Sequence, residues 1–259
     1  MEEIRRIGII AALGCVVGCF AHLGAASPAL AAVPRASGIW CNREPDWALS
    51  AEHERVLTQS LRRITGLCDL SFAADGSLSL GDVSEGGAAT ARQILQQVLC
   101  SGMAFIIQDH SNSAAINFGQ LDEGLIYEDE TRRRLMIWQV RLDFADFSEM
   151  QAPPEVRASF DEGFTLLHEL LHGLGLKDTL RAEEVGECEQ TLNRARAELG
   201  LPLRDQYFGE PTHLAPGITS VRLRFSSQRS PFKRPERRRH YLYFLLKDCP
   251  RLPIRRADY

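Results

Sequence analysis

The sequence has little net charge, no internal repeat and no low-complexity tract. Its 259 residues carry a formal net charge of -4, and 44% of them are hydrophobic while 25% are charged. This composition is typical of an ordinary globular chain, long enough for one sizeable domain or two small ones. Because the charge is nearly balanced, no overall electrostatic field indicates nucleic acid as a partner.

The first 31 residues have the pattern of a signal peptide. Two arginines precede an apolar run over residues 7–26, and the small residues Ala29 and Ala31 suit a signal peptidase. The chain is therefore expected to be exported, either to the periplasm or out of the cell. A lipoprotein signal with lipid attached to Cys19 is one alternative, and an uncleaved membrane anchor is another.

The sequence also lacks a CxxC pair, which argues against a dedicated cysteine-ligated zinc site. After the export signal it has an odd number of cysteines, namely Cys41, Cys68, Cys100, Cys188 and Cys249. In an exported chain such residues tend to pair, so one or two disulfides are expected with one thiol left over. Cys188 lies on the apolar stripe of a predicted helix and is the expected buried free cysteine.

Hydrophobic periodicity predicts an α+β fold with one main domain. Apolar residues recur at helical spacing in four segments, residues 50–67, 88–99, 155–174 and 180–199. Short apolar runs bounded by polar residues or glycine predict strands at residues 103–107, 114–118, 135–142, 221–225 and 240–246. The dipeptide Asp75-Gly76 between two further runs predicts a β-hairpin.

These patterns divide the chain into four parts. Residues 1–31 form the signal peptide, and residues 32–150 form either the N-terminal α+β part of the catalytic domain or a removable pro-segment. Residues 151–210 hold two helices, and residues 211–259 are a basic C-terminal extension with two strands. A solvated basic face is the simplest interpretation of this extension, and contact with an anionic surface is the alternative.

The motif His168-Glu169-Leu170-Leu171-His172 lies within the third predicted helix. Residues four apart lie on one face of a helix, so His168 and His172 can present two imidazole nitrogens to one metal ion. Glu169 can then act as general base on a water bound to Zn²⁺. Burying two histidines and a carboxylate among leucines without a shared partner is costly, which favours a zinc site over ordinary helix histidines.

A catalytic zinc ion normally has three protein ligands, and two residues compete to be the third. Asp178 follows His172 by six residues with glycines between them, although it also has the position of an N-cap for the next helix. Glu189 lies at the edge of the inward stripe of that next helix. Asn193, one turn further, is placed to hydrogen-bond one of the two histidines as a second-shell group.

Residues 165–207 resemble the zincin metallopeptidases, in which a motif helix packs beside a mixed sheet. Asp178 matches the extended pattern of the metzincin clan, where snapalysin-like members use Asp as third ligand. However, no methionine follows Met150 to form the Met-turn of that clan. Glu189 with Asn193 is similar to the gluzincin arrangement, at a shorter spacing. The ending Gly-Leu-Pro-x-Arg, which leads to Tyr207, resembles bacterial effector-type zinc metallopeptidases.

The resemblance implies a zincin-like fold, with a small mixed sheet packed on the motif helix and a second helix. It implies a zinc peptidase, more often an endopeptidase, that acts on a peptide or protein. Glu189 is the preferred third ligand and Asp178 the alternative. Such enzymes often place a Tyr or His beyond the third ligand as donor to the oxyanion, and the residues available for this are Tyr207, which is kept as the candidate, His213, Tyr241 and Tyr243. The alternative function is a non-catalytic zinc-binding or envelope-associated interaction protein, which would bind zinc without hydrolysing peptides.

Overall fold

The computed structural model describes residues 37–81, 86–111, 113–122, 124–128, 134–179, 181, 184–215, 218–228 and 237–246. The predicted signal peptide, Cys19 and Cys249 lie outside these residues. Within the described part of the chain, no helix is both long enough and apolar enough to cross a bilayer.

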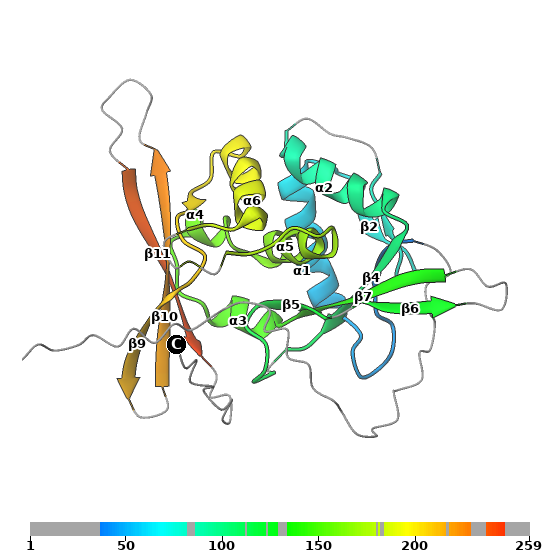
Figure 1. Cartoon of the computed structure of the whole chain (residues 1–259), viewed down its shortest axis with the longest axis horizontal. Coiled ribbons are helices and arrows are strands. Elements are labelled where there is room, and N and C mark those ends of the chain that lie inside the picture. The colour runs from blue at the N-terminus through cyan, green and yellow to red at the C-terminus, as the bar shows by residue number, and fades with distance from the viewer. Residues whose placement is uncertain are drawn as a thin grey trace, which may run out of the picture.

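The chain has a mixed α+β fold, as predicted, in which helices lie between two sheets (Figure 1). The helices are α1 (Ala51–Thr65), α2 (Ala89–Cys100), α3 (Phe144–Glu149), α4 (Pro154–Arg157), α5 (Glu162–Gly173) and α6 (Glu187–Glu198). The strands are β1 (Gly38–Cys41), β2 (Ser71–Phe72), β3 (Leu78–Ser79), β4 (Met103–Asp109), β5 (Gly119–Leu121), β6 (Leu125–Glu128), β7 (Arg134–Leu142), β8 (Leu203–Arg204), β9 (Glu210–Ala215), β10 (Ile218–Gln228) and β11 (Arg237–Leu246).

The larger sheet is mixed and carries the motif helix. Strands β1, β4 and β7 are parallel neighbours, and the short strands β5 and β6 both pair antiparallel with the outer edge of β7. The helix-facing side chains of β4 and β7, which include Phe105, Ile107, Val140 and Leu142, join α1, α2 and α5 in the main hydrophobic core. The antiparallel edge strand β5 lies directly against α5.

The motif helix α5 is anchored to α1 at its beginning. The Asp161 side chain caps the helix by accepting a hydrogen bond from the Phe164 amide, and it also accepts one from the Ser60 hydroxyl of α1 at 2.6 Å. This cap explains why the predicted helix over residues 155–174 is divided into α4 and α5. Gly163 lets the two helices approach closely, since a Cβ there would lie 2.3 Å from Ser60 Oγ.

Two further predictions about the elements are wrong. The predicted helix over residues 180–199 begins only at Glu187, so Asp178 does not cap it but lies in a preceding loop. Lys177 and Glu187 close that loop through two hydrogen bonds of 2.9 and 3.0 Å. The strand predicted at residues 114–118 is also absent: Phe118 has a left-handed φ of 63°, and β5 begins one residue later.

The two strands predicted in the C-terminal part are present as β10 and β11, and they belong to a second sheet. β10 pairs antiparallel with β11 on one side and with β8 and β9 on the other. Apolar side chains of β10 and β11 pack with Phe118, Phe147 and Phe160 in a second core. β10 and β11 therefore form part of a layer that packs against the rest of the described fold.

Replacing Gly163 by Ala tests the close approach of α1 and α5. The added methyl group would overlap Ser60 Oγ and approach Ile64 within 2.8 Å. Overpacking of this kind costs about 1–3 kcal/mol, more than the helix propensity gained from Ala. The denaturation midpoint of Gly163→Ala is expected to fall in urea titrations, whereas Gln97→Ala on the exposed face of α2 should leave it nearly unchanged. A Gly163→Ala variant as stable as the wild type would contradict this packing.

Candidate metal centre

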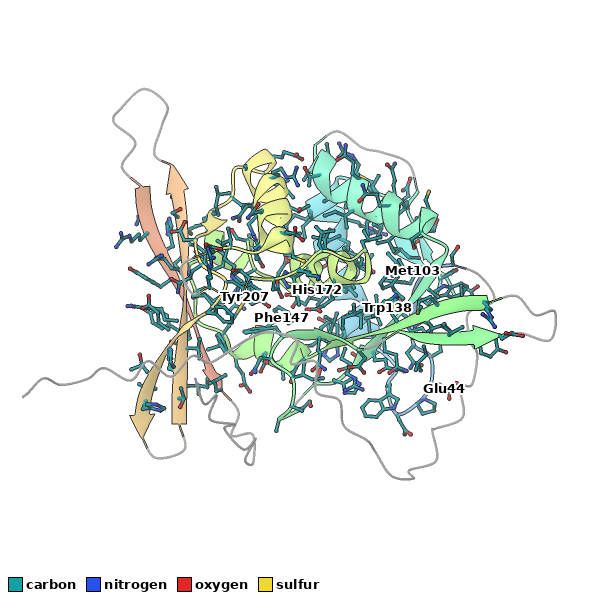
Figure 2. The ribbon with its side chains drawn as sticks, viewed as in Figure 1. Glu44, Met103, Trp138, Phe147, His172 and Tyr207 are labelled. Atoms are coloured by element: carbon teal, nitrogen blue, oxygen red, sulfur yellow. The ribbon has the colours of Figure 1, made fainter. Side chains whose placement is uncertain are left out.

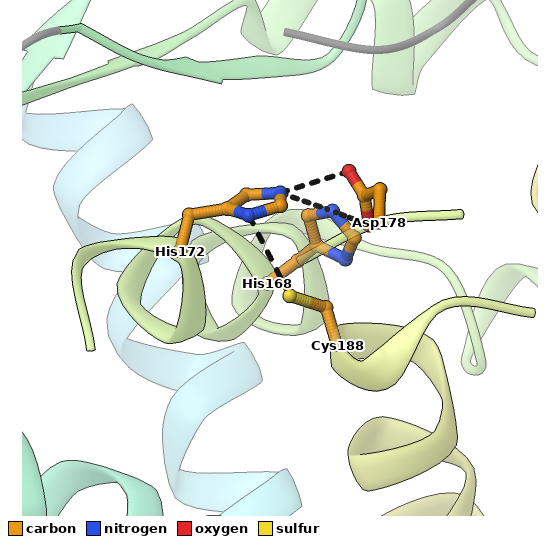
Figure 3. A group of neighbouring side chains, drawn as sticks. All are labelled: His168, His172, Asp178 and Cys188. Carbon is orange, nitrogen blue, oxygen red and sulfur yellow. Dashed lines mark hydrogen bonds and ion pairs between the residues drawn. The ribbon is translucent and has the colours of Figure 1, made fainter. Parts of the chain in front are cut away.

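Three predicted site residues converge, two from α5 and one from the loop that follows. The Nε2 atoms of His168 and His172 lie 3.1 Å apart. Asp178 Oδ2 lies 2.9 Å from His172 Nε2, and Asp178 Oδ1 lies 3.5 Å from His168 Nε2. With Cys188 these residues offer ligand atoms that all lie within 4.8 Å of one another (Figure 3). The group is largely buried and could hold a metal ion.

Several buried polar atoms at this site have no hydrogen-bond partner, which fits a metal ion. They are Asp178 Oδ1, Glu169 Oε2 and His168 Nδ1, and none of them has a hydrogen-bond partner among the described residues. An unsatisfied buried acceptor costs free energy that a bound cation would offset. Two imidazole nitrogens and a carboxylate oxygen are also a common donor set for divalent transition metals.

Charge explains how the metal-free site is held together. Burial by itself would lower the pKa of His168, but the nearby carboxylates of Asp178 and Glu189 outweigh burial and raise it to about 10. The pKa of His172 is raised in the same way by Asp178. Burial would raise the pKa of Asp178, yet the two histidines hold it well below its usual range. When no metal is bound, protons on the two histidines therefore supply the positive charge of the site.

Glu169 lies on α5 between the histidines in sequence and faces the edge strand β5. A Cβ at Gly119 of β5 would lie 3.4 Å from Glu169 Oε1 and only 2.6 Å from Thr165 Cγ2, so this position needs glycine. Burial raises the pKa of Glu169, although both histidines and a backbone hydrogen bond from Leu121 oppose the shift. A carboxylate with a raised pKa is suited to accept and return a proton.

Glu189, the preferred third ligand from sequence, is not part of the metal group. Its side chain is only 2% exposed, and it accepts hydrogen bonds from Arg196 at 2.6 Å and from Arg204 at 2.7 Å. Its Oε1 atom also lies 3.2 Å from Nδ1 of His168, the ring nitrogen on the opposite side from Nε2. The geometry favours the alternative, Asp178, as the residue that completes the group.

Asn193 does not hydrogen-bond either histidine, contrary to the expectation from sequence. Its amide donates to the Arg204 carbonyl at 2.8 Å and accepts from the Arg204 amide at 2.9 Å. It also accepts from Arg196 Nη1 at 3.0 Å. Its turn of α6 therefore faces β8, and Asn193 fixes the backbone of Arg204 instead of a metal ligand.

Tyr207 is close to the site and is influenced by two of its residues. Its ring stacks on that of His168 with centroids 6.0 Å apart and an interplanar angle of 15°. Burial raises its pKa, and the negative charge of Asp178 raises it further. Figure 2 shows Tyr207 and His172 in the middle of the molecule, where the two sheets approach the motif helix. Tyr207 is thus placed next to the candidate metal group.

Cys188 is the member of the group that sequence analysis did not associate with the metal. It is free and fully buried, as predicted, and its Sγ lies 3.6 Å from His172 Nδ1. The same nitrogen lies 3.1 Å from the Leu176 carbonyl, so Cys188 is on the far side of the imidazole from Nε2. The expected disulfides are absent among the described cysteines, since Cys41, Cys68, Cys100 and Cys188 are all free.

Comparison of the chain with protein-family models, characterised proteins and solved structures gave no match. The functional argument therefore depends on the motif and on the geometry of the described residues.

The histidine charges predict how the stability of the metal-free protein depends on pH. His168 has a folded-state pKa of about 10 and an ordinary pKa of 6.5, so the folded state binds an extra proton between these values. The contribution of His168 to the free energy of unfolding is therefore fully present below pH 6.5 and is lost as pH rises toward about 10. Urea titrations of the chelator-treated protein would measure this. His168→Gln should flatten the profile and His213→Gln, at an exposed position, should not; a flat wild-type profile would contradict the charge assignment.

Thiol labelling tests the position of Cys188. Burial raises its pKa and removes it from solvent, so iodoacetamide should leave it unmodified in the native protein. Cys68 and Cys100 are exposed and should react within the same exposure time. Peptide mass spectrometry with and without urea would give the modification at each cysteine. Rapid native labelling of Cys188 would show that it does not lie behind His172.

Proposed function

We propose that the protein is an exported zinc metallopeptidase that hydrolyses peptide bonds in a peptide or protein substrate. The observation that carries this proposal is the convergence of His168 Nε2, His172 Nε2 and the Asp178 carboxylate beside Glu169. Export rests on the N-terminal sequence pattern.

In this proposal the metal is held by His168, His172 and Asp178. A set of two histidines and one carboxylate leaves a fourth position open, as catalytic zinc sites require. Asp178 is favoured over Glu189 because one of its carboxylate oxygens has no other partner, whereas both Glu189 oxygens are bonded to arginines. Bound zinc would supply a water of lowered pKa and a positive charge for the substrate carbonyl.

Glu169 is assigned as the general base. Its buried carboxylate neighbours His168 on α5, and its raised pKa suits both removal of a proton from the attacking water and delivery of that proton to the leaving amine. Tyr207 is retained as the donor to the oxyanion, since its ring stacks on His168 and its side chain faces Asp178.

The edge strand β5 supports a peptide as the substrate. It pairs with β7 on one side, and no other described strand pairs with its second edge. An extended peptide can add to such an edge through main-chain hydrogen bonds. Because β5 lies directly against Glu169, a peptide bound there would extend to both sides of the reacting bond, which favours an endopeptidase.

Zinc content and proteolysis together test the function. Elemental analysis of the purified wild type should give one zinc per chain, and His168→Ala and Asp178→Ala should each lose the metal. Glu169→Gln should retain zinc but lower the rate of hydrolysis of fluorescently labelled, denatured casein by about 10²–10⁴-fold, the usual contribution of a general base.

The outcomes separate the proposal from its alternative. Zinc in the wild type without hydrolysis of casein or of a mixed peptide library would favour a non-catalytic zinc-binding protein. Absence of zinc, even after refolding with the metal, would reject the metallopeptidase. Glu198→Gln, an exposed change on α6 away from the site, is the control and should retain both properties.

A further inference from the structure

We propose that Glu189 is a positioning residue, which holds Nδ1 of His168 so that Nε2 faces the metal, and that Arg196 and Arg204 fix Glu189 for this task. The inference rests on the proposed metal centre, and it concerns residues that supply no ligand to the metal in that proposal. It assigns a function to the buried charged cluster of Glu189, Arg196 and Arg204.

The two nitrogens of His168 have different neighbours. Nε2 lies 3.1 Å from His172 Nε2 and 3.5 Å from Asp178. Nδ1 is buried and forms an ion pair with Glu189 Oε1 at 3.2 Å, and it has no hydrogen-bond partner of good geometry among the described residues. A carboxylate at Nδ1 favours the tautomer with the proton on Nδ1, and this leaves the Nε2 lone pair available for a metal. His172 has an equivalent arrangement, in which the Leu176 carbonyl lies 3.1 Å from its Nδ1. Each proposed histidine ligand is thus oriented through its Nδ1 atom, His172 by a backbone carbonyl and His168 by Glu189.

The arginines make Glu189 a fixed partner. Arg196 is 1% exposed, and it donates to Glu189 Oε2 and to the Ser159 carbonyl at 2.9 Å. Its guanidinium also lies 4.9 Å from the centroid of the Phe164 ring. Arg204 donates to Glu189 Oε1 and to the carbonyls of Gln206 and Tyr207. With these contacts neither Glu189 oxygen can turn toward the metal without breaking an ion pair with a buried arginine, which is costly.

Arg204 connects this cluster to the C-terminal sheet. It lies on β8, where its backbone pairs with Phe225 of β10. The Asn193 side-chain amide also forms two hydrogen bonds with the Arg204 backbone. The chain of contacts therefore runs from β10 through Arg204 and Glu189 to His168. We infer that the C-terminal sheet supports the metal centre, although it supplies no ligand to it.

The first test uses the wild-type chain, labelled with ¹⁵N-histidine and loaded with ¹¹³Cd²⁺ as a spectroscopic substitute for zinc. The expected NMR result is a ¹¹³Cd–¹⁵N coupling to Nε2 of His168, with Nδ1 carrying a proton. Coupling to Nδ1, or an Nδ1 without a proton, would overturn the proposal. This measurement does not depend on a variant that folds.

The second test compares metal affinity in Glu189→Gln and Glu198→Gln by competition with a chromophoric zinc chelator. Both substitutions remove one negative charge from α6, but only Glu189→Gln removes a charge that lies next to His168. Loss of a group that orients a ligand from behind typically weakens metal affinity by about 10–100-fold, so this loss is expected for Glu189→Gln alone. Asp178→Asn, which removes a proposed ligand, should be weaker still.

The outcomes distinguish this inference from the proposed function. Equal zinc affinity in wild type and Glu189→Gln would overturn the positioning role and leave the peptidase intact. Loss of metal in Glu189→Gln but not in Asp178→Asn would make Glu189 a ligand and overturn the inference as well. A protein that positions His168 and binds zinc but never hydrolyses peptides would reject the function and retain the inference.

Discussion

Burial of charge within the main core is the constraint on which this structure depends. His168 is enclosed on one side by Asp178 and on the other by Glu189, and both carboxylates are themselves largely buried. A histidine between two carboxylates in an apolar interior requires positive charge, which either protons or a metal ion can supply. The helix, the loop after it and the two arginines can all be understood as ways to satisfy that requirement.

The same requirement explains how the layers are joined. The motif helix packs on the mixed sheet through leucines, and its polar face is directed toward β5, the Asp178 loop and α6. Arg204 then links α6 to β8, while the aromatic core around Phe118 and Phe160 attaches the second sheet to the segment before α5. Polar and apolar contacts therefore both converge on α5.

Local sequence patterns were sufficient for the parts of the site that share one element. The spacing of His168, Glu169 and His172 fixes their common helix, and burial by leucines could be inferred directly. Local patterns could not decide whether Asp178 or Glu189 is the third ligand. A helical wheel shows that Glu189 points inward. It does not show that Arg204, fifteen positions later on strand β8, forms an ion pair with the Glu189 carboxylate. The late start of α6 depends likewise on the Lys177–Glu187 contact, which closes a loop rather than continuing a helix.

The pairing of β8 with β10 determines when, during synthesis, Arg204 can reach its final position. Arg204 is held opposite Phe225, so the chain must extend beyond that position before the arginine has its final backbone partner. During synthesis the motif helix would be complete long before its support is. If His168 depends on this support, the nascent chain lacks a fully formed centre until β10 has emerged. The order of residues along the polypeptide would then delay maturation of the centre until β8 and β10 can pair.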